Sequence, residues 1–294
     1  ALEESEFEHS KNVTLEDIRT IEDDSGRLVG RIFCENLFEG HPYAFPLIGY
    51  SDSVRGLSHG DLLKHYKQLI QHAPMVVSVS GKFDSKKVID IFEKIQRINI
   101  GNASSKHLEW SGPKAPRLAE VKKSREQSHL VMGFRGTSVG TQDSYILRVL
   151  LTVLSGQSGR LFTELRDKQG LCYTVAPISF EGIEPGYVGV YMGCDPTKRT
   201  AALKGIRAEL DRIAQKSISP VELKRAKEFI LGRHHMDMQL NGAIASASAF
   251  NTLYGIGFDE HLKIAERLKN IDVKAVKNLA ERIFGSPSVT AIVV

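Results

Sequence analysis

The longest apolar stretch of the sequence is the feature that limits its possible folds most strongly. It runs over Tyr145–Leu154 and is interrupted by Arg148. A helix that crosses a bilayer needs about 20 apolar residues, roughly twice this length. A helix over Asp143–Ser155 would instead be apolar on nearly every side, which is typical of a helix at the centre of a folded domain. The sequence therefore predicts a globular domain built around this helix.

Composition agrees with a globular protein. The chain has 294 residues, of which 41% are hydrophobic and 25% charged, and these proportions exclude disordered and collagen-like proteins. A net charge of +4, without a basic run or a nucleic-acid-binding motif, gives no case for binding nucleic acid. The three cysteines lie far apart with no CxxC spacing, which predicts neither a disulfide framework nor a thiolate zinc site. We interpret all three as small buried residues: Cys34, Cys172 and Cys194.

The N-terminal residues carry no targeting signal. Ala1–His9 is acidic and lacks both a basic region and an apolar region, so it is not a signal peptide. Because the chain starts without Met, we expect it to be processed, truncated or cut from a larger protein.

Helix and strand signals are mixed after residue 125, without regular alternation, which predicts an α+β fold. Strands are expected at 129–134, 171–180, 187–193 and 289–294. Helices are expected at 143–155, 158–168 and 203–213, and from residues 220, 259 and 272. The start at Ser219–Glu222 is a strong signal, because it combines an N-cap, Pro at the first helical position and Glu at the third. We expect this helix to continue past Gly232 into the Ala-rich stretch around Ala247.

The first hundred residues give a similar mixture. Apolar residues at helical spacing predict a helix within 14–38, and Ser58 with Asp61 forms a capping box for another. The β-branched run Met75–Ser80, ended by Gly81, predicts a buried strand. Asp84 then caps a helix whose expected inward side chains are Val88, Ile91, Phe92 and Ile95.

A change in composition divides the chain. The stretch Asn99–Arg125 is rich in Gly, Ser, Pro and Lys, which predicts a linker. Trp110 within it is expected to pack onto a domain. We therefore predict a partial first αβ domain over 1–100, a linker over 101–125 and a second αβ domain over 126–294.

Several candidate sites are weak. No HExxH or HxxEH sequence occurs. Two His pairs are present, but neither has a nearby third ligand, which hydrolytic zinc requires: His65 with His72, and His234 with His235. The turn Gly156–Gly159 is similar to a nucleophile elbow, but the final Gly is absent and a helix is expected before it instead of a strand. We interpret Ser158 as a helix N-cap. The same turn could cradle an anion, although it lacks the Lys-Ser/Thr pair of a P-loop.

Two donors follow this turn. Arg166 falls in the last turn of a short helix and Tyr173 at the start of a strand, on either side of a reversal at Gly170. A guanidinium beside a phenol O–H suits a peptide carbonyl or a developing oxyanion. The alternative is a surface Arg166 paired with Glu164 or Asp167, and a packing role for Tyr173.

Two long motifs resemble the pitrilysin/insulinase family of zinc metallopeptidases, which includes the mitochondrial processing peptidases. The first is GQSGRLFTELRDKQGLCYTV, at residues 156–175, which resembles the signature of the family's second domain. The second is LFEGHPYAFPLIGYSDSVRGLSHGDLLKHYKQLI, at residues 37–70, which resembles the segment that closes the first domain. The following VVSVSGKFDSKKV is similar to the family's strand, glycine and helix. The resemblance extends from about residue 10 to the C-terminus.

The resemblance implies specific roles and departures. The family binds zinc through the two His of HxxEH and a later Glu, and the position of that Glu is occupied by Asp17. The family's supporting Glu falls on Ser10, and the HxxEH segment would precede residue 1. The family's substrate-holding Arg and Tyr match Arg166 and Tyr173. We therefore expect no zinc on this chain alone, although the intact enzyme would use zinc.

By resemblance, the intact protein consists of two homologous αβ domains that close like a clamshell on a peptide, the first only partly present here. The chain would contribute the substrate-holding half of a zinc metalloendopeptidase, with a missing N-terminal half or a homologous subunit as partner. The alternative is a non-catalytic homologue that binds peptides or acts as a scaffold for an active subunit. Ser10 and Asp17 favour this alternative, whereas Arg166 with Tyr173 favours the enzyme. For a bacterial member the resemblance implies a periplasmic location.

Overall fold

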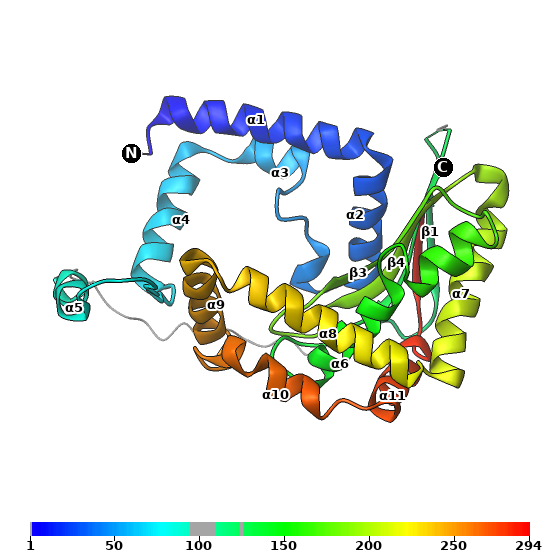
Figure 1. Cartoon of the computed structure of the whole chain (residues 1–294). Coiled ribbons are helices and arrows are strands. Elements are labelled where there is room, and N and C mark those ends of the chain that lie inside the picture. The colour runs from blue at the N-terminus through cyan, green and yellow to red at the C-terminus, as the bar shows by residue number, and fades with distance from the viewer. Residues whose placement is uncertain (1, 95–109, 124–125) are drawn as a thin grey trace. The chain divides into compact units, whose positions relative to one another are not determined.

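The computed structural model describes residues 2–94, 110–123 and 126–294, and the chain divides into two compact units (Figure 1). The first, which we call the helical unit, comprises Ala1–Glu16, Tyr50–His107 and Arg233–Ile264. The second, the sheet unit, comprises Asp17–Gly49, Leu108–Gly232 and Ala265–Val294.

The described elements agree with an α+β fold. The helices are α1 (Glu4–Asp23), α2 (Ser25–Leu37), α3 (Ser51–Gly56), α4 (His59–His72), α5 (Ser85–Glu93), α6 (Gln142–Leu154), α7 (Arg199–Lys216), α8 (Pro220–Asp237), α9 (Asn241–Leu253), α10 (Ile264–Lys269) and α11 (Val273–Phe284). The strands are β1 (Arg117–Val121), β2 (Ser128–Arg135), β3 (Thr174–Phe180), β4 (Tyr187–Cys194) and β5 (Val289–Val293). None of the described helices is both long and apolar enough to cross a membrane.

One mixed sheet organises the sheet unit. Its strand order is β1-β5-β2-β4-β3, with β1 parallel to β5 and the other neighbours antiparallel. Every residue of β5 is buried, whereas β1 and β3 at the two edges are largely exposed. The buried centre and the exposed edges follow from this order, because only the inner strands have neighbours on both sides.

Helix α2 covers one face of the sheet. Its apolar stripe, with Leu28, Val29, Ile32 and Phe33, packs against Val131 of β2 and the alternate residues of β5. The approach is close at Gly133, where an added Cβ would lie 2.4 Å from the Phe33 ring. Gly133 therefore allows α2 to lie directly on the sheet.

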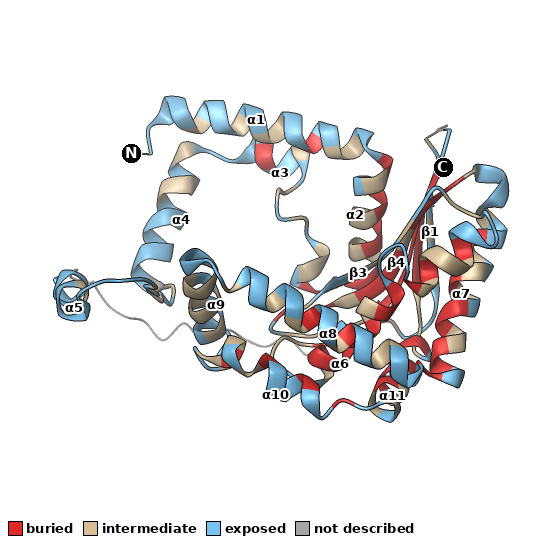
Figure 2. Cartoon of the chain, viewed as in Figure 1, coloured by how far each residue is buried: buried red, intermediate tan, exposed pale blue. Residues whose placement is uncertain are grey.

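The other face carries α6, α7 and α11, and Figure 2 shows buried residues, in red, along these helices. Phe134 of β2 meets Phe284 of α11 with ring centroids 5.4 Å apart. The buried residues of α6 occur around the whole helix, and its exposed residues are Gln142 at the start and Arg148. The prediction of a central apolar helix is therefore confirmed.

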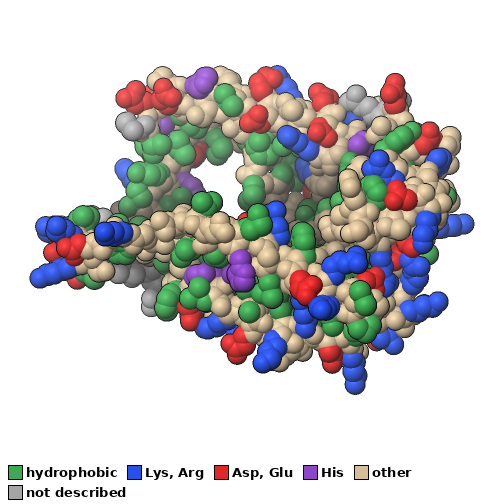
Figure 3. Space-filling view, viewed as in Figure 1, with side chains coloured by type: hydrophobic (Ala, Val, Ile, Leu, Met, Phe, Trp, Pro, Cys, Tyr) green, Lys and Arg blue, Asp and Glu red, His purple; other side chains and the backbone are tan. Residues whose placement is uncertain are grey.

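The helical unit has much less core. Val54 and Ile264 are the hydrophobic residues buried in its described part, and α4, α5 and α9 have none. Figure 3 shows hydrophobic side chains at the surface of this unit. Apolar faces that were expected to be inward, including Ile91 and Phe92 of α5, are exposed. Ile95 lies outside the described residues.

Three sequence predictions about elements were wrong. Met75–Ser80 forms no strand, and Met75, Val77 and Val79 are exposed, because no neighbouring strand among the described residues completes its hydrogen bonds. The helix from Pro220 ends at Asp237, before a turn and a new helix at Asn241, where Asn and Gly are weak helix formers. The helix expected within 14–38 is interrupted at Asp24, which caps α2.

The expected linker also contains structure. Residues 101–109 and 124–125 lie outside the described residues, but 117–121 form β1, whose hydrogen bonds come from β5 at the distant C-terminus. Trp110 packs on Phe38, with ring centroids 4.6 Å apart, as predicted. The compact units do not follow the boundaries at 100 and 126, because α2 belongs to the sheet unit. The boundaries describe homologous domains and remain a prediction.

Candidate functional site

A widened helical turn holds Arg166. Residues Phe162–Asp167 are π-helical, and the turn ends at Gly170, whose φ is +58°. The Gly170 N–H donates to the Arg166 carbonyl at 3.0 Å, and the Leu171 N–H donates to the Leu165 carbonyl at 2.9 Å. The positive φ is a conformation that glycine adopts at little cost. The reversal predicted at Gly170 is therefore present, and it is fixed by backbone hydrogen bonds.

The Arg166 side chain is exposed and lies over an aromatic ring. Its guanidinium carbon is 4.7 Å from the centroid of Phe162, one turn earlier in the same helix. Glu164, the partner in the alternative interpretation, pairs with Lys168 at 2.7 Å and with Arg212 at 3.5 Å. A contact with an aromatic face orients a guanidinium without using its N–H donors. Arg166 is thus held in place but keeps donors for a ligand.

Tyr173 lies at a bend immediately before β3. Its N–H donates to the Gly193 carbonyl at 2.9 Å, and Thr174, the first residue of β3, is paired with Gly193 in the strand register. The backbone of Tyr173 is therefore tied to β4. The Tyr173 side chain is 59% exposed, so it does not belong to the core.

Cys172 lies between the reversal at Gly170 and Tyr173. Burial raises the pKa of the Cys172 thiol, while the positive charge of Arg166 opposes this rise. That Arg166 and Tyr173 act on one ligand remains a prediction.

The predicted metal position lies on α1 and is not part of a ligand cluster in the described residues. Asp17 lies exposed on α1, and no group of three His, Cys, Asp or Glu residues that could hold a metal occurs in the described part of the chain. Burial raises the pKa of Cys34 and Cys194 to about 11, so these thiols stay protonated at neutral pH. The donor set of the described residues does not fit zinc.

The surroundings of Ser158 differ from those of a nucleophile elbow. It lies in the turn between α6 and the following helix, and no strand precedes it. The first carbonyl to accept an intrahelical hydrogen bond is that of Gly159, from the Thr163 N–H at 3.0 Å, so the helix begins one residue later than expected.

Comparisons with known proteins place this geometry in context. The sequence model of the family described as "Peptidase M16 inactive domain" matches residues 56–230. An uncharacterized zinc protease of Streptomyces coelicolor is 27% identical over 94% of this chain and 62% of its own length. An uncharacterized zinc protease of Bacillus subtilis is 25% identical over 99% of this chain and 71% of its own length. The chain thus spans less than two thirds of the first of these relatives.

Solved structures agree on the fold. The structure titled a peptidase M16 inactive domain from Pseudomonas fluorescens matches with a TM-score of 0.85 at 17% identity, covering 98% of this chain and 70% of the other. A chain of complex III from Candida albicans matches with a TM-score of 0.78 at 18% identity, covering 96% of this chain and 70% of the other. At these identities the likeness concerns the fold alone, and it confirms the predicted α+β class.

Proposed function

Since this chain belongs to the peptidase M16 inactive-domain family, as the resemblance of its motifs predicted, we propose that it contributes the substrate-holding half of a zinc-dependent metalloendopeptidase. In this proposal Arg166 and Tyr173 bind the carbonyl groups of a peptide substrate. The relatives from Streptomyces coelicolor and Bacillus subtilis are named zinc proteases, which supports peptide hydrolysis as the activity of the complete protein.

The observation that carries the proposal is the turn at residues 162–173. It holds an exposed guanidinium on the Phe162 ring and an exposed phenol at the bend before β3. Both are supported by backbone hydrogen bonds at Gly170, Leu171 and Tyr173. Donors held in place by backbone hydrogen bonds need little reorganisation when charge develops on a substrate oxygen. A packing role alone gives no reason for both side chains to be exposed.

The chemistry assigned to these residues is limited to binding and orientation. The guanidinium is always charged and donates two parallel hydrogen bonds, and the phenol O–H donates one more. Both would bind a carbonyl oxygen in the substrate and bind it more strongly as it becomes an oxyanion.

Zinc would be held outside the residues described here. Because Asp17 has no clustered ligands, we assign no catalytic step to a metal bound by this chain. The zinc-binding half, either an N-terminal half of the first domain or a homologous subunit, would be the partner. The exposed apolar faces of the helical unit support such a partner, because large apolar surfaces mark interaction sites.

The second candidate function is a non-catalytic homologue that binds peptides or acts as a scaffold. Two observations favour it: the matching family is described as an inactive domain, and one structural neighbour belongs to complex III of Candida albicans. Reading the residues encoded before Ala1 for HxxEH separates the two candidates, because a scaffold does not need that segment.

The test is the Tyr173→Phe variant of the complete protein. It keeps the ring and deletes only the O–H, so kcat for peptide cleavage should fall by about 10²–10³. Arg166→Lys keeps the positive charge but loses the planar guanidinium with its paired N–H donors, and it should also lower kcat. The matched control is Tyr66→Phe, at a tyrosine that is 47% exposed in the helical unit, which should cleave at the parent rate.

The melting temperature should stay near that of the parent in these variants. If Tyr173→Phe cleaves peptides at the parent rate while Tyr173→Ala unfolds the sheet unit, the packing interpretation is correct and the proposal fails.

A further inference from the structure

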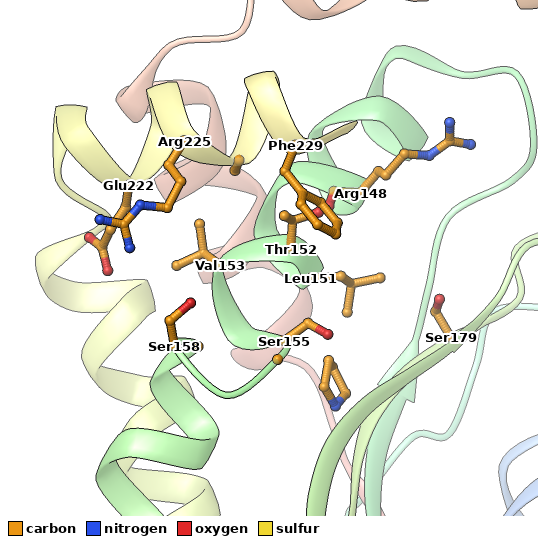
Figure 4. A pocket seen from close by; sticks show the side chains of 14 residues that line it. Arg148, Leu151, Thr152, Val153, Ser155, Ser158, Ser179, Glu222, Arg225 and Phe229 are labelled. Atoms are coloured by element: carbon orange, nitrogen blue, oxygen red, sulfur yellow. The ribbon is translucent and has the colours of Figure 1, made fainter. Parts of the chain in front are cut away.

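A pocket of about 380 Å³ lies within the sheet unit, apart from Arg166 and Tyr173. It is bounded by the end of α6, the turn at residues 155–159, part of β3 and the first half of α8 (Figure 4). This volume is at the lower end of ligand-binding sites, which suits a short segment better than a large cofactor.

The turn that forms one wall needs a glycine at a specific position. An added Cβ at Gly159 would lie 2.1 Å from the Ser155 carbonyl oxygen, so the turn can return this closely to the end of α6 only with glycine. Gly156 precedes it with a φ of +78°. This is the Gly-rich turn that the sequence indicated as a possible anion site, and the structure shows a pocket beside it.

The middle of the pocket is apolar. Leu151 and Val153 of α6, Pro177 of β3, and Ala226 and Phe229 of α8 line it. Phe229 is 59% exposed, so its ring is accessible to a ligand in the pocket.

The ends of the pocket are positively charged. Arg148 and Arg225 are exposed and lie at opposite ends, with Phe229 between them (Figure 4). The Arg225 side chain extends toward Glu222, whereas that of Arg148 extends outward, with its guanidinium carbon 5.7 Å from the centroid of the Tyr145 ring. No carboxylate lies within 4.0 Å of either guanidinium in the described residues, although Arg148 acts at longer range on Glu181. An arginine pair of this kind attracts carboxylates.

The acidic residue of the pocket is already neutralised. Glu222 accepts two hydrogen bonds from the Arg160 guanidinium, both at 2.7 Å, and a third from the Ser219 N–H at 2.7 Å. These bonds lower the pKa of Glu222 to about 2, so it stays ionised and paired. Arg148 and Arg225 therefore set the sign of the potential in the pocket.

From this arrangement we propose that the pocket binds an extended peptide segment in which acidic residues flank an apolar side chain. The apolar side chain would contact Phe229 and Val153, and the carboxylates would meet Arg148 and Arg225. The proposal rests on the peptide-binding function proposed above and adds a second contact for the substrate.

Strand β3 connects the two places. Pro177 lies four residues along the chain from Tyr173, which corresponds to about 13 Å in an extended strand. A peptide held at Tyr173 would need about four further residues to reach the pocket. The pocket would thus select substrates by sequence several residues from the bond that is cleaved.

The test measures binding of labelled peptides to the full chain, without any requirement for hydrolysis. The probe is a blocked, fluorescein-labelled peptide Gly-Glu-Leu-Leu-Glu-Gly, and its control has Gln in place of both Glu residues. We expect the acidic peptide to bind at least about tenfold more tightly than the control, as a charge-assisted hydrogen bond predicts. Its affinity should also fall as the salt concentration rises.

Variants locate the binding. The double variant Arg148→Gln and Arg225→Gln should weaken the acidic peptide by about tenfold or more. The matched control is Lys224→Gln, which removes a positive charge from the neighbouring residue of α8 that does not line the pocket, and it should bind as the parent does. Phe229→Ala replaces an exposed side chain, so it should fold normally and still weaken binding.

Equal affinity for the acidic and Gln peptides, or parent affinity in the double variant with an unchanged melting temperature, would overturn the proposal. Tyr173→Phe distinguishes the two proposals. If that variant keeps the full peptide cleavage rate while the arginine variants lose binding, the function proposed for Arg166 and Tyr173 fails and the pocket remains.

Discussion

The sheet unit and the helical unit use similar sequence patterns but reach different degrees of burial. Helix α11 of the sheet unit buries five residues, including Leu279 and Phe284, against α6 and α7. Helix α5 of the helical unit has an equally clear apolar face and buries none of it. An amphipathic pattern therefore identifies the face that requires a partner, but burial depends on whether a sheet or helix lies opposite.

The two β-branched runs repeat this contrast. Val289–Val293 lies between β1 and β2 and is completely buried, whereas Met75–Ser80 has no pairing strand among the described residues and exposes alternate side chains. Strand formation depends on hydrogen bonds from a neighbour, so the same composition gives a strand in one unit and an irregular extended segment in the other.

The largest expected effect is loss of a core aromatic residue from the sheet unit. Phe33 is fully buried and meets Tyr187 edge to face, with ring centroids 5.3 Å apart. Phe33→Ala should lower the free energy of unfolding by about 3–5 kcal/mol. Phe92→Ala, at an exposed position of α5, should cost less than about 1 kcal/mol. Urea denaturation of both variants measures the difference, and equal losses would contradict the contrast between the units.

The next effect concerns ion pairs. Glu222→Gln breaks the bidentate pair with Arg160 in the sheet unit and should cost about 1–2 kcal/mol. Asp52→Asn breaks the pair with Arg55 in the helical unit, where the aspartate side chain is 97% exposed, and should cost little. Thermal unfolding at pH 7 measures both variants.

The pH dependence of this pair has a defined sign. The pKa of Glu222 is lowered from 4.5 to about 2 in the folded state, chiefly by the Arg160 hydrogen bonds. Its stabilisation is therefore fully present above about pH 4.5 and lost as the pH falls through about 2. As the pH is lowered from about 4.5 to about 2, the free energy of unfolding should fall less in the Glu222→Gln variant than in the parent. Parallel curves of unfolding free energy against pH for the two proteins would show that Glu222 does not have this lowered pKa.

A small effect is expected where the helical unit already exposes apolar side chains. Val77→Thr, in the unpaired segment, should change the free energy of unfolding by no more than about 0.5 kcal/mol. The same substitution at the buried Val289 of β5 should cost more than 1 kcal/mol, since a hydroxyl would lack a partner there, roughly as buried polar groups do elsewhere. Denaturation curves that shift equally would show that Met75–Ser80 is covered in solution.

No effect is expected from metal removal. Because neither unit contains a cluster of ligands in its described residues, EDTA should leave the melting temperature of this chain unchanged. Elemental analysis should detect no stoichiometric zinc. About one tightly held zinc per chain with His ligands would overturn the interpretation that the zinc-binding half lies elsewhere.

Local signals account for most of the predictions that the structure matches. Ser58 with Asp61 and Asp84 cap helices as expected, the helix expected from residue 272 begins there with Asp272 as its N-cap, and Ser219 with Glu222 forms the predicted capping box. The reversal at Gly170 was also predictable, since it requires one residue with a positive φ. In each case a side chain or a glycine interacts with backbone groups within about three residues along the chain. The local sequence is therefore enough to predict the cap or the turn.

The candidate site was predictable only in part. The sequence placed Arg166 and Tyr173 on either side of a reversal, but it did not indicate the contact of Arg166 with Phe162 or the hydrogen bond from the Tyr173 N–H to the Gly193 carbonyl. The pocket beside the turn was predicted only as a weak anion site. Its charge depends on the Arg160–Glu222 pair, whose members are 62 residues apart.

The sequence by itself thus determined the helix caps, the central apolar helix α6, the turn at Gly170 and the α+β class, because these depend on periodicity and on contacts between near neighbours. Only the tertiary structure decided that β1 pairs with the C-terminal strand, that α2 covers the sheet, and that Met75–Ser80 stays unpaired. It also decided that Arg148 and Arg225 flank one pocket. These features join residues far apart in the chain, and only the packing of the folded protein supplies the partner that each one needs.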